Sequence, residues 1–228
     1  MTLDLSGSTV VATGAFGRLG RILARRLVEA GATVAGLDAR AADPFVDSDR
    51  LHLYRADLID EAAVADVFER VRRDLGTPDA VVHTVGMWAG SPFAETALEA
   101  WETVLRVNLT STFLCFREAV RQFRQANKPG RLVAVASQQG AEGGVPEQAA
   151  YSASKAGVVR LVEAVAAEHA EAGITAAAVA PSMILFGEEE GDAKGVSAER
   201  IADLCAYLAS EEGAVHSGTV VRAYGTLR

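Results

Sequence analysis

The sequence predicts an α/β protein, a doubly wound seven-stranded parallel sheet with helices on both faces, folded as a single domain over residues 1–228. Two observations lead to this prediction. Short runs of aliphatic and β-branched residues recur along the chain, separated by longer stretches with helical periodicity, as in a parallel sheet with crossover helices. The chain is also half hydrophobic and long enough to bury one extended core.

The elements follow in order along the chain. The expected strands are 8–14 (STVVATG), 32–38 (ATVAGLD), 51–57 (LHLYRAD), 79–86 (DAVVHTVG), 131–137 (RLVAVAS), 174–181 (ITAAAVAP) and 218–225 (GTVVRAYG). The expected helices are Leu19–Ala30, Glu61–Leu75, Ala97–Gln125, Tyr151–Ala172 and Ala198–Ala209. Gly31, Gly76 and Gly173 each follow a helical pattern and can adopt the left-handed conformation that ends a helix.

Two segments interrupt this pattern. The polar run VNLTST inside Ala97–Gln125 predicts a kink, because Asn, Thr and Ser side chains divert backbone hydrogen bonds. The acidic, glycine-bearing segment 187–195 predicts a mobile surface loop that acts as a short lid.

Charge and composition exclude several classes of protein. The net charge is −8, and no run of Lys or Arg is long enough to follow a phosphate backbone, so nucleic acid is not an expected partner. The first residues have neither the pattern of a signal peptide nor the length of a membrane span, so we expect a cytoplasmic protein with no membrane partner. Cys115 and Cys205 lack metal-ligand spacing and fall in apolar helical runs, which predicts buried reduced thiols and no metal site.

A glycine-rich turn, VVATGAFGRLG, follows the first strand and opens the first helix. A dinucleotide pyrophosphate can rest there on backbone amides and the helix dipole, although turns also need glycine for steric reasons alone. Asp38 ends the second strand, where a carboxylate can accept hydrogen bonds from the adenosine ribose or serve only as a turn residue. Because a carboxylate repels a 2′-phosphate, we expect NAD(H) to be preferred. Arg18 and Arg40 are cations close to this position in the sequence, so NADP(H) is not excluded as a cofactor.

A second candidate site is the tyrosine–lysine pair in AAYSASKAG. Tyr151 and Lys155 are four residues apart and lie on one helix face, so the ammonium can approach the phenol and lower its pKa from about 10. The phenol could then exchange protons with a substrate. Tyrosine–lysine pairs at this spacing are also common on solvated helices. The catalytic interpretation is favoured because this pair follows the fifth strand of a dinucleotide-binding pattern.

These motifs together resemble the short-chain dehydrogenase/reductase family in its compact single-domain form. The resemblance extends from TGAFGRLG to HSGTVVRAYG, with ADL, a VG after the fourth strand, VNLTSTF, GRLVAVAS, YSASK and APS in the family's order. A Rossmann-type fold is implied, as is a homo-oligomer, a tetramer or a dimer. The stretch VGMWAGSPF is similar to the dihydropteridine reductase branch, although aromatic packing under the loop is the expectation we favour for it.

The resemblance also implies roles for single residues. Tyr151 would give a proton in carbonyl reduction and accept one in alcohol oxidation, Ser137 would hold the substrate oxygen, and Lys155 would bind the nicotinamide ribose. Asn108 would anchor a water leading to Lys155. The expected cofactor contacts are Gly14, Phe16, Arg18, Leu19, Gly20, Asp38, Asp57, Leu58, Thr84, Val85, Gly86, Tyr151, Lys155, Pro181 and Ile184.

The chain departs from the family pattern at several of these positions. Arg18 replaces the second glycine of the turn, His83 and Thr84 replace an asparagine-rich turn, and Phe186 stands where the family often has a threonine. We expect His83 to be a structural residue. The interval from Ser137 to Tyr151 is one residue longer than the commonest spacing in the family. If residues are counted back from Tyr151 at that spacing, Gln138 takes the place of Ser137, so Gln138 stays an alternative.

The predicted function is therefore an NAD(H)-dependent oxidoreductase that interconverts a secondary alcohol and a ketone, with Tyr151 as general acid and base. One alternative is a regulator that binds NAD(P)(H) without turnover. Another is a reductase of a pteridine or of a different C=O or C=N group. An epimerase or dehydratase is disfavoured because the chain is too short for the extra substrate domain of such relatives.

Overall fold

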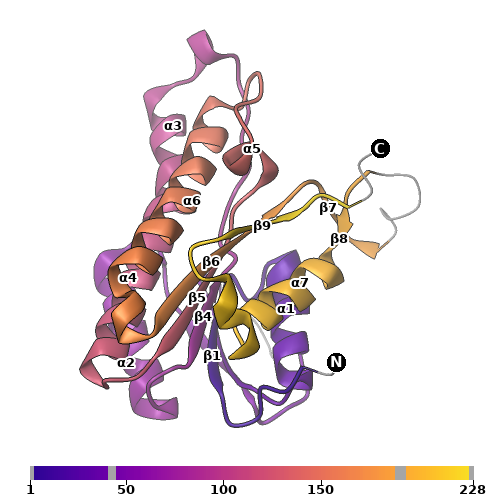
Figure 1. The fold of residues 1–228 in the computed structure, drawn as a ribbon. Helices are drawn as coiled ribbons and strands as arrows, with labels where there is room; N and C mark the ends of the chain where they lie inside the picture. The colour runs from indigo at the N-terminus through magenta and orange to yellow at the C-terminus, as the bar shows by residue number, and fades with distance from the viewer. Residues whose placement is uncertain (1–2, 41–44, 188–193, 226–228) are drawn as a thin grey trace.

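The computed structural model describes residues 3–40, 45–187 and 194–225. Seven parallel strands form one sheet in the order β3-β2-β1-β4-β5-β6-β9, which confirms the predicted doubly wound fold (Figure 1). The strands are β1 (Thr9–Thr13), β2 (Thr33–Asp38), β3 (Leu51–Arg55), β4 (Ala80–His83), β5 (Gly130–Val135), β6 (Ile174–Pro181) and β9 (Val220–Ala223).

The strand order creates a crevice at the carboxyl edge of the sheet. From β1 the chain moves outward to β2 and β3, then returns to β4 on the other side of β1 and continues outward to β9. Connections that leave the ends of β1 and β4 therefore run in opposite directions. In doubly wound sheets this switch point is where ligands bind.

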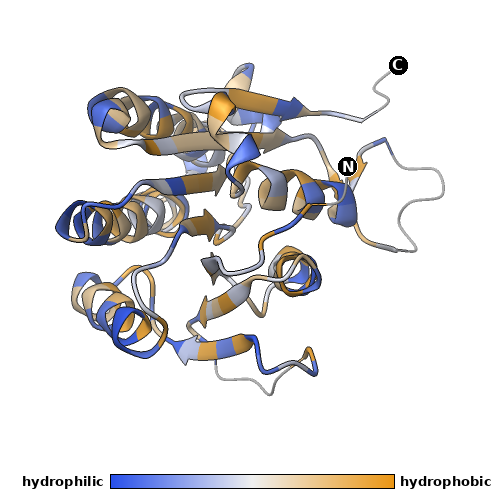
Figure 2. Cartoon of the chain, turned by 60° about the horizontal axis from the view of Figure 1, so that its bottom comes forward, coloured by the Kyte–Doolittle hydropathy of each residue, from blue (hydrophilic) through white to orange (hydrophobic). Residues whose placement is uncertain are grey.

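Helices cover both faces of the sheet. They are α1 (Arg18–Glu29), α2 (Glu61–Leu75), α3 (Leu98–Leu105), α4 (Ser111–Gln125), α5 (Gln138–Ala141), α6 (Ala149–His169) and α7 (Ala198–Leu208). Figure 1 shows α2, α4 and α6 on one side of the strands and α1 and α7 on the other. In Figure 2 hydrophobic residues concentrate along the strands and on the helix faces turned toward them.

Each face of the sheet has its own hydrophobic core. Phe68, Phe116 and Phe123 are buried against the strands under α2 and α4. On the opposite face Leu23 of α1 and Ile201 of α7 are fully buried. Because the strands are buried on both faces, they appear in the sequence as continuous aliphatic runs without polar alternation.

Capping residues explain several helix boundaries. The Asp60 side chain accepts a hydrogen bond from the Ala63 amide at 2.9 Å and begins α2, and Gly76, at φ 84°, ends it. Gly173 takes the left-handed conformation predicted for it, at φ 69° and ψ 18°. By contrast α1 begins after Gly17 without a side-chain cap, which leaves the first amides of this helix to other partners.

The structure differs from the expected elements in several places. The segment 97–125 is two helices joined by a π-helix at Arg106–Thr110, where a kink was expected. Helix α6 begins at Ala149, before the expected Tyr151, and the turn 170–172 is a 3₁₀-helix. The sequence interpretation also missed α5 and a separate two-stranded sheet of β7 (Ile184–Leu185) and β8 (Val196–Ser197).

The predicted lid 187–195 lies mostly outside the described residues, since 188–193 are not described. Among the helices that the structure describes, none combines the length and the apolar character needed to cross a bilayer.

Candidate active site

Two adjoining cavities lie at the carboxyl edge of the sheet. The inner cavity, of about 490 Å³, lies between the glycine turn and the ends of β2 and β4. The outer cavity, of about 680 Å³, lies between the end of β5, the start of α6 and the β7 segment. Ten predicted cofactor contacts line the inner cavity: Gly14, Arg18, Leu19, Gly20, Asp38, Asp57, Leu58, Thr84, Val85 and Gly86. Tyr151, Lys155, Pro181 and Ile184 line the outer one together with Ser137.

The glycine turn has the shape of a phosphate cradle. Gly14 has φ 67°, and a Cβ there would lie 2.9 Å from the Thr84 hydroxyl oxygen. At Gly20 a Cβ would overlap the carbonyl group of Gly14. The turn can therefore form only with glycine at these positions, and it opens onto the uncapped amino end of α1. These residues fit the pyrophosphate of a dinucleotide.

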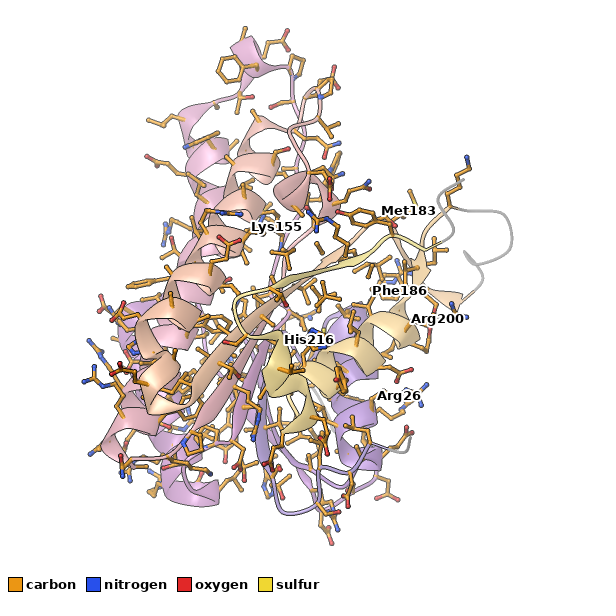
Figure 3. All side chains as sticks on the ribbon, in the orientation of Figure 1. Arg26, Lys155, Met183, Phe186, Arg200 and His216 are labelled. Atoms are coloured by element: carbon orange, nitrogen blue, oxygen red, sulfur yellow. The ribbon has the colours of Figure 1, made fainter. Side chains whose placement is uncertain are left out.

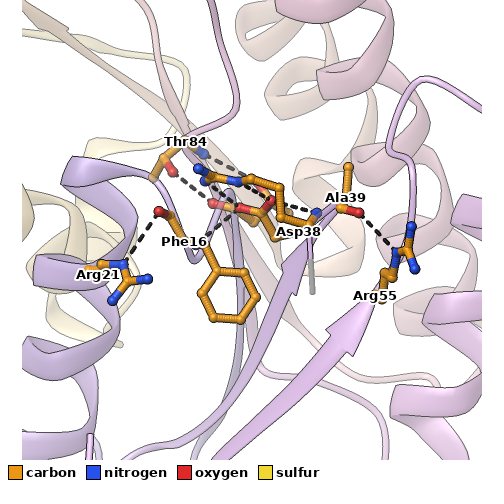
Figure 4. Close-up of polar contacts among 8 residues, drawn as sticks. Phe16, Arg21, Asp38, Ala39, Arg55 and Thr84 are labelled. Carbon is orange, nitrogen blue, oxygen red and sulfur yellow. Dashed lines mark hydrogen bonds and ion pairs between the residues drawn. The ribbon is translucent and has the colours of Figure 1, made fainter. Parts of the chain in front are cut away.

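Asp38 lies at the far end of the inner cavity and is almost fully buried (Figure 4). One carboxylate oxygen accepts a hydrogen bond from the Phe16 amide at 3.0 Å and from the Arg40 guanidinium at 3.2 Å. The other accepts bonds from the Arg40 amide and Nε at 3.0 and 3.1 Å. Burial alone would raise the pKa of Asp38, but these bonds and the Arg40 charge hold the pKa below its ordinary value. Asp38 is thus an anion in the lining of the inner cavity.

Phe16 is placed differently from the prediction. Its ring is buried and packs edge-on against Phe45 at 5.7 Å between centroids, with the Arg21 guanidinium also near both rings. The ring lines neither cavity. Only the backbone of Phe16 takes part in the site, through its bond to Asp38.

The His83–Thr84 pair braces the end of β4, although it departs from the family pattern. The His83 ring is hydrogen-bonded to the hydroxyls of Thr13 at 2.9 Å and Ser111 at 3.0 Å, and so joins β1 to α4. Burial, with the nearby Lys155 charge, lowers the pKa of His83 to about 3, so the ring is neutral. The Thr84 hydroxyl donates to the Thr13 carbonyl at 2.7 Å. His83 is a structural residue, as expected.

Ser137 and Tyr151 meet in the outer cavity. Ser137 is buried at the start of α5, where its hydroxyl accepts a bond from the Gly140 amide at 3.2 Å. Tyr151 lines the same cavity, and the Ser137 side chain is one of the groups that affect the pKa of its phenol. Gln138 lines this cavity as well, but only the Ser137 side chain affects the pKa of the Tyr151 phenol, which favours Ser137 as the partner of Tyr151.

The pKa of Tyr151 differs from the expectation. Burial raises the pKa of this phenol above its ordinary value of 10.0, and the Ser137 side chain offsets only part of the rise. The expected lowering by Lys155 is therefore wrong for the chain without a bound cofactor. At neutral pH the phenol is protonated, the form required of a proton donor.

Lys155 points from α6 toward the strands (Figure 3). Its ammonium donates to the Val135 carbonyl at 2.8 Å, and burial lowers its pKa to about 8. A Cβ at Gly86 would lie 3.1 Å from this ammonium and 3.3 Å from the Asn108 amide oxygen. The absence of a side chain at Gly86 therefore allows Lys155 to reach the junction of the two cavities.

Asn108 lies behind this junction, fully buried in the π-helix. Its side-chain oxygen accepts from the Met87 amide at 2.7 Å, and its amino group donates to the Met87 carbonyl at 3.0 Å and to Ser154 at 2.9 Å. Asn108 thus ties the segment after β4 to α6. It lines neither cavity.

Trp88 forms an exposed wall of the outer cavity. Its side chain is 64% exposed and does not pack under a loop, which corrects the expectation of aromatic packing. The indole donates to the Gln148 side chain at 3.3 Å, and Gly90 lies against the indole, since a Cβ there would be 3.1 Å from it. Gln148 follows Glu147, whose φ of 61° is unusual for a residue with a side chain. A flat aromatic surface is therefore held in place beside Tyr151.

Two departures from the family pattern meet over the inner cavity. The Arg18 guanidinium stacks on the Phe186 ring at 3.9 Å to the centroid. The sequence interpretation did not place Phe186 in the site, nor did it identify the other lining residues of the inner cavity, Gly17, Ala39, Arg40, Ile59 and Val107. Two of them had a signal, since Gly17 belongs to the glycine-rich turn and Arg40 lies two residues after Asp38.

Comparison with known proteins agrees with this geometry. Residues 8–190 match the family model described as short chain dehydrogenase. The chain is 31% identical to short-chain dehydrogenase/reductase eriH of Hericium erinaceus, over 94% of this chain and 95% of that protein. It is 32% identical to cis-4-hydroxycyclohexanecarboxylate dehydrogenase of Sinomonas cyclohexanicum, over 94% of each.

A solved short chain dehydrogenase from Mycobacterium smegmatis superposes with a TM-score of 0.86 at 28% identity, and the match covers 100% of this chain and 95% of that one. Three of the relatives that match along nearly the whole chain are named as dehydrogenases or reductases. The chain belongs to the short-chain dehydrogenase/reductase family of NAD(P)-dependent oxidoreductases.

Proposed function

We propose that this protein interconverts a secondary alcohol and a ketone by direct hydride transfer, with NAD(H) as the preferred cofactor and Tyr151 as general acid and base. The observation that carries the proposal is the convergence of Tyr151, Ser137 and Lys155 on one cavity that adjoins the glycine cradle. Ser137 comes from the turn after β5, and Tyr151 and Lys155 come from α6. Packing alone does not require a hydroxyl, a phenol and an ammonium there.

In the reducing direction, Ser137 hydrogen-bonds the carbonyl oxygen and orients the substrate carbon toward the inner cavity. The Tyr151 phenol then gives its proton to that oxygen as the C=O bond becomes CH–OH, and in oxidation the same phenol oxygen takes the proton back. A bound nicotinamide supplies or accepts the hydride. Lys155 donates to a ribose hydroxyl and, as a cation, stabilises the phenolate that follows proton transfer.

Cofactor choice depends on Asp38. A buried carboxylate with a lowered pKa favours a free ribose diol and disfavours a 2′-phosphate in the same place. Arg40, whose side chain is 62% exposed, covers this carboxylate and could pair with a phosphate instead. NAD(H) is therefore the proposed cofactor, with NADP(H) as a weaker substitute.

Trp88 supports a substrate with a ring. Its exposed indole gives a substrate a flat apolar surface on which to stack, about the size of a six-membered ring. The relative from Sinomonas cyclohexanicum is named for a cyclohexane alcohol. The same surface also favours, as a second candidate, a reductase of a pteridine or another planar C=N compound.

A substrate panel tests the proposal. Cyclic and linear ketones, the matching alcohols and a dihydropteridine are incubated with NAD(H) or NADP(H), and nicotinamide absorbance is followed. We expect turnover of a cyclic ketone or alcohol, faster with NAD(H). Binding of the dinucleotide without turnover of any compound would favour a cofactor-binding regulator instead.

We also propose that the protein works in the cytoplasm as a homotetramer or dimer. The family resemblance implies such an assembly, and Phe113 of α4 is an aromatic side chain left 43% exposed on the surface. Sedimentation of the purified chain measures the assembly, and a monomer at micromolar concentration would contradict this part of the proposal.

A further inference from the structure

Glu142 joins the end of α5 to the last strand of the sheet. One oxygen of its carboxylate, Oε1, accepts a hydrogen bond from the Tyr224 phenol at 2.7 Å and another from Nε of Arg222. Arg222 lies in β9, and Tyr224 follows that strand directly. Side chains two residues apart in extended chain point to the same side, so both can reach one carboxylate. Three groups from two distant segments of the chain thus form one polar cluster (Figure 1 shows α5 above β9).

The groups of this cluster are in the protonation states that these bonds require. The bonds from Arg222 and Tyr224 hold the pKa of Glu142 below its ordinary value, so this side chain is a carboxylate. Burial and the bond to Glu142 raise the pKa of Tyr224 to about 12, so the phenol keeps its proton and donates it. A carboxylate with one charged and one neutral donor is held more firmly than one in a simple exposed ion pair.

Glu142 and Ser137 lie at the two ends of α5. Ser137 caps the amino end of this helix, and Glu142 caps the carboxyl end, where its amide donates to the Gln138 carbonyl at 2.8 Å. The four residues of α5 form a single turn, which has little stability of its own. The turn packs directly on α6, because a Cβ at Gly140 would lie 2.5 Å from the backbone of Lys155. A constraint on Glu142 therefore limits where Ser137 can lie.

The same end of β9 also holds a second wall of the outer cavity. Ser182 lines this cavity, and its amide donates to the Ala223 carbonyl and its hydroxyl to the Tyr224 carbonyl, both at 3.1 Å. Gly225 packs against Gly195, just before β8, since a Cβ at Gly225 would lie 2.1 Å from the Gly195 carbonyl oxygen. The end of this edge strand therefore contacts both α5 and the segments that follow β6.

We propose that Glu142, Arg222 and Tyr224 form a clamp, the β9 clamp, that positions two walls of the outer cavity for the reaction. None of the three lines the inner or the outer cavity, so they are positioning residues that act through Ser137 and Ser182. The clamp keeps the Ser137 hydroxyl in the place where it holds the substrate oxygen. This inference rests on the proposed function, which gives Ser137 that role.

Four variants and one control test the β9 clamp. Glu142→Ala removes the acceptor, Glu142→Gln keeps an uncharged acceptor, Tyr224→Phe removes one donor, and Glu142→Ala/Tyr224→Phe removes both groups. Glu69→Ala is the matched control, because Glu69 forms an ion pair of similar exposure with Arg72 on α2 and lines neither cavity. For each protein, kcat and KM are measured with the best substrate of the panel, and the Kd for NADH by fluorescence. Backbone hydrogen exchange is followed in peptides that contain α5.

In Glu142→Ala, exchange in α5 should be severalfold faster. The kcat should fall about tenfold, because a displacement of about 1 Å at a positioning residue can cost up to about 100-fold. The Kd for NADH should stay within about twofold, since the clamp shares no partner with the inner cavity.

The other variants should follow in order. Tyr224→Phe should lower kcat less than Glu142→Ala does, and Glu142→Gln should restore most of the kcat. The double variant should be no slower than Glu142→Ala, because both changes remove the same contact. Glu69→Ala should match the unmodified protein in every measurement.

Equal exchange in α5 in the unmodified protein and in Glu142→Ala would overturn the clamp, as would an unchanged kcat. A fall in kcat matched by weaker NADH binding would also overturn it, because the chain would then be disturbed as a whole. Failure of the proposed function is a different result. The unmodified protein then turns over no compound of the panel, and exchange in α5 alone decides whether the clamp exists.

Discussion

Asp38 determines cofactor choice through one buried charge. Replacement by alanine removes the carboxylate that would repel a 2′-phosphate and releases Arg40 from its ion pair. We predict that Asp38→Ala changes the ratio of NADPH to NADH affinity at least about tenfold in favour of NADPH, which corresponds to about 1.4 kcal/mol. Fluorescence titration with both cofactors measures this ratio. An unchanged ratio, or an unmodified protein that already prefers NADPH, would contradict the role of Asp38.

Lys155 makes stability depend on pH. Burial lowers its pKa to about 8 in the folded chain, against an ordinary value of 10.5. The unfolded chain therefore binds this proton more tightly, and the cost of burying the charge is present in full below pH 8. This cost disappears as the pH rises toward 10.5, so this residue makes the free energy of unfolding rise through that window.

The prediction compares the unmodified protein with Lys155→Met, in the absence of cofactor. The stability of the variant relative to the unmodified protein should decline by about 1 kcal/mol per pH unit above pH 8, as the lysine loses its charge. Denaturant unfolding at pH 7.5, 8.5 and 9.5 provides the data. A stability difference that stays constant across these values would show that Lys155 is not buried as a titrating group.

The sequence predicted the identity of these site residues but not their surroundings. Tyr151 and Ser137 were predicted from motif order, and the structure places both side chains in the outer cavity. The sign of the pKa shift of Tyr151 could not be predicted, because it depends on how far the phenol is buried. Trp88 was misjudged for the same reason, since the bond to Gln148 that holds it in the cavity joins residues 60 positions apart.

At the scale of the element, the turn between β1 and α1 allows a matched test. A Cβ at Gly20 would overlap the Gly14 carbonyl, whereas a Cβ at Gly143 would meet nothing within 4 Å. We predict that Gly20→Ala lowers the free energy of unfolding by roughly 2–4 kcal/mol, as forced overlap in a packed turn does, and weakens cofactor binding. Gly143→Ala should change neither by more than about 0.5 kcal/mol. Thermal unfolding and cofactor titration compare the two, and equal behaviour would refute the cradle.

Element boundaries were predictable where a local cause exists. The helix Glu61–Leu75 was predicted with its observed ends. Gly76 marked its carboxyl end in the sequence, and the structure shows that Asp60 caps its amino end. The π-helix at Arg106–Thr110 could be foreseen only as an irregularity, because the structure reaches it through contacts of Asn108 with the distant Met87 and Ser154. The strand pair β7–β8 consists of two residues on each side, too short for any periodic pattern to reveal.

At the scale of the whole molecule, the two cores predict inert cysteines. Cys115 lies under α4 on one face of the sheet and Cys205 under α7 on the other, and both are fully buried. Burial raises the pKa of Cys205 to about 12, and that of Cys115 above its ordinary value with a contribution from Glu118. Thiolates are therefore rare in the folded chain.

We predict that a disulfide reagent labels both thiols at once in denaturant and at least about 1,000-fold more slowly in the native protein, since labelling then requires unfolding. Absorbance of the released thiol follows the reaction. Rapid native labelling of one cysteine would show that the core around it is open.

The whole architecture was the most predictable level. Seven aliphatic runs and five helical stretches are enough to specify a doubly wound parallel sheet, and the sheet order agrees with that prediction. The switch point between β1 and β4 then places the glycine turn, Asp38 and the Tyr151 helix at one edge. What the sequence could not show is that Arg18 and Phe186 meet across that edge, because their contact depends on how the chain folds after β6.

The central claim is that the Tyr151 phenol transfers the proton in the outer cavity. The most direct measurement compares the unmodified protein with Tyr151→Phe, using the best substrate of the panel. The account predicts that the variant binds NADH within about twofold of the unmodified protein while its kcat falls by about 10²–10⁴-fold, as expected when only the proton-transfer group is lost. Turnover in the variant at the rate of the unmodified protein would contradict the account.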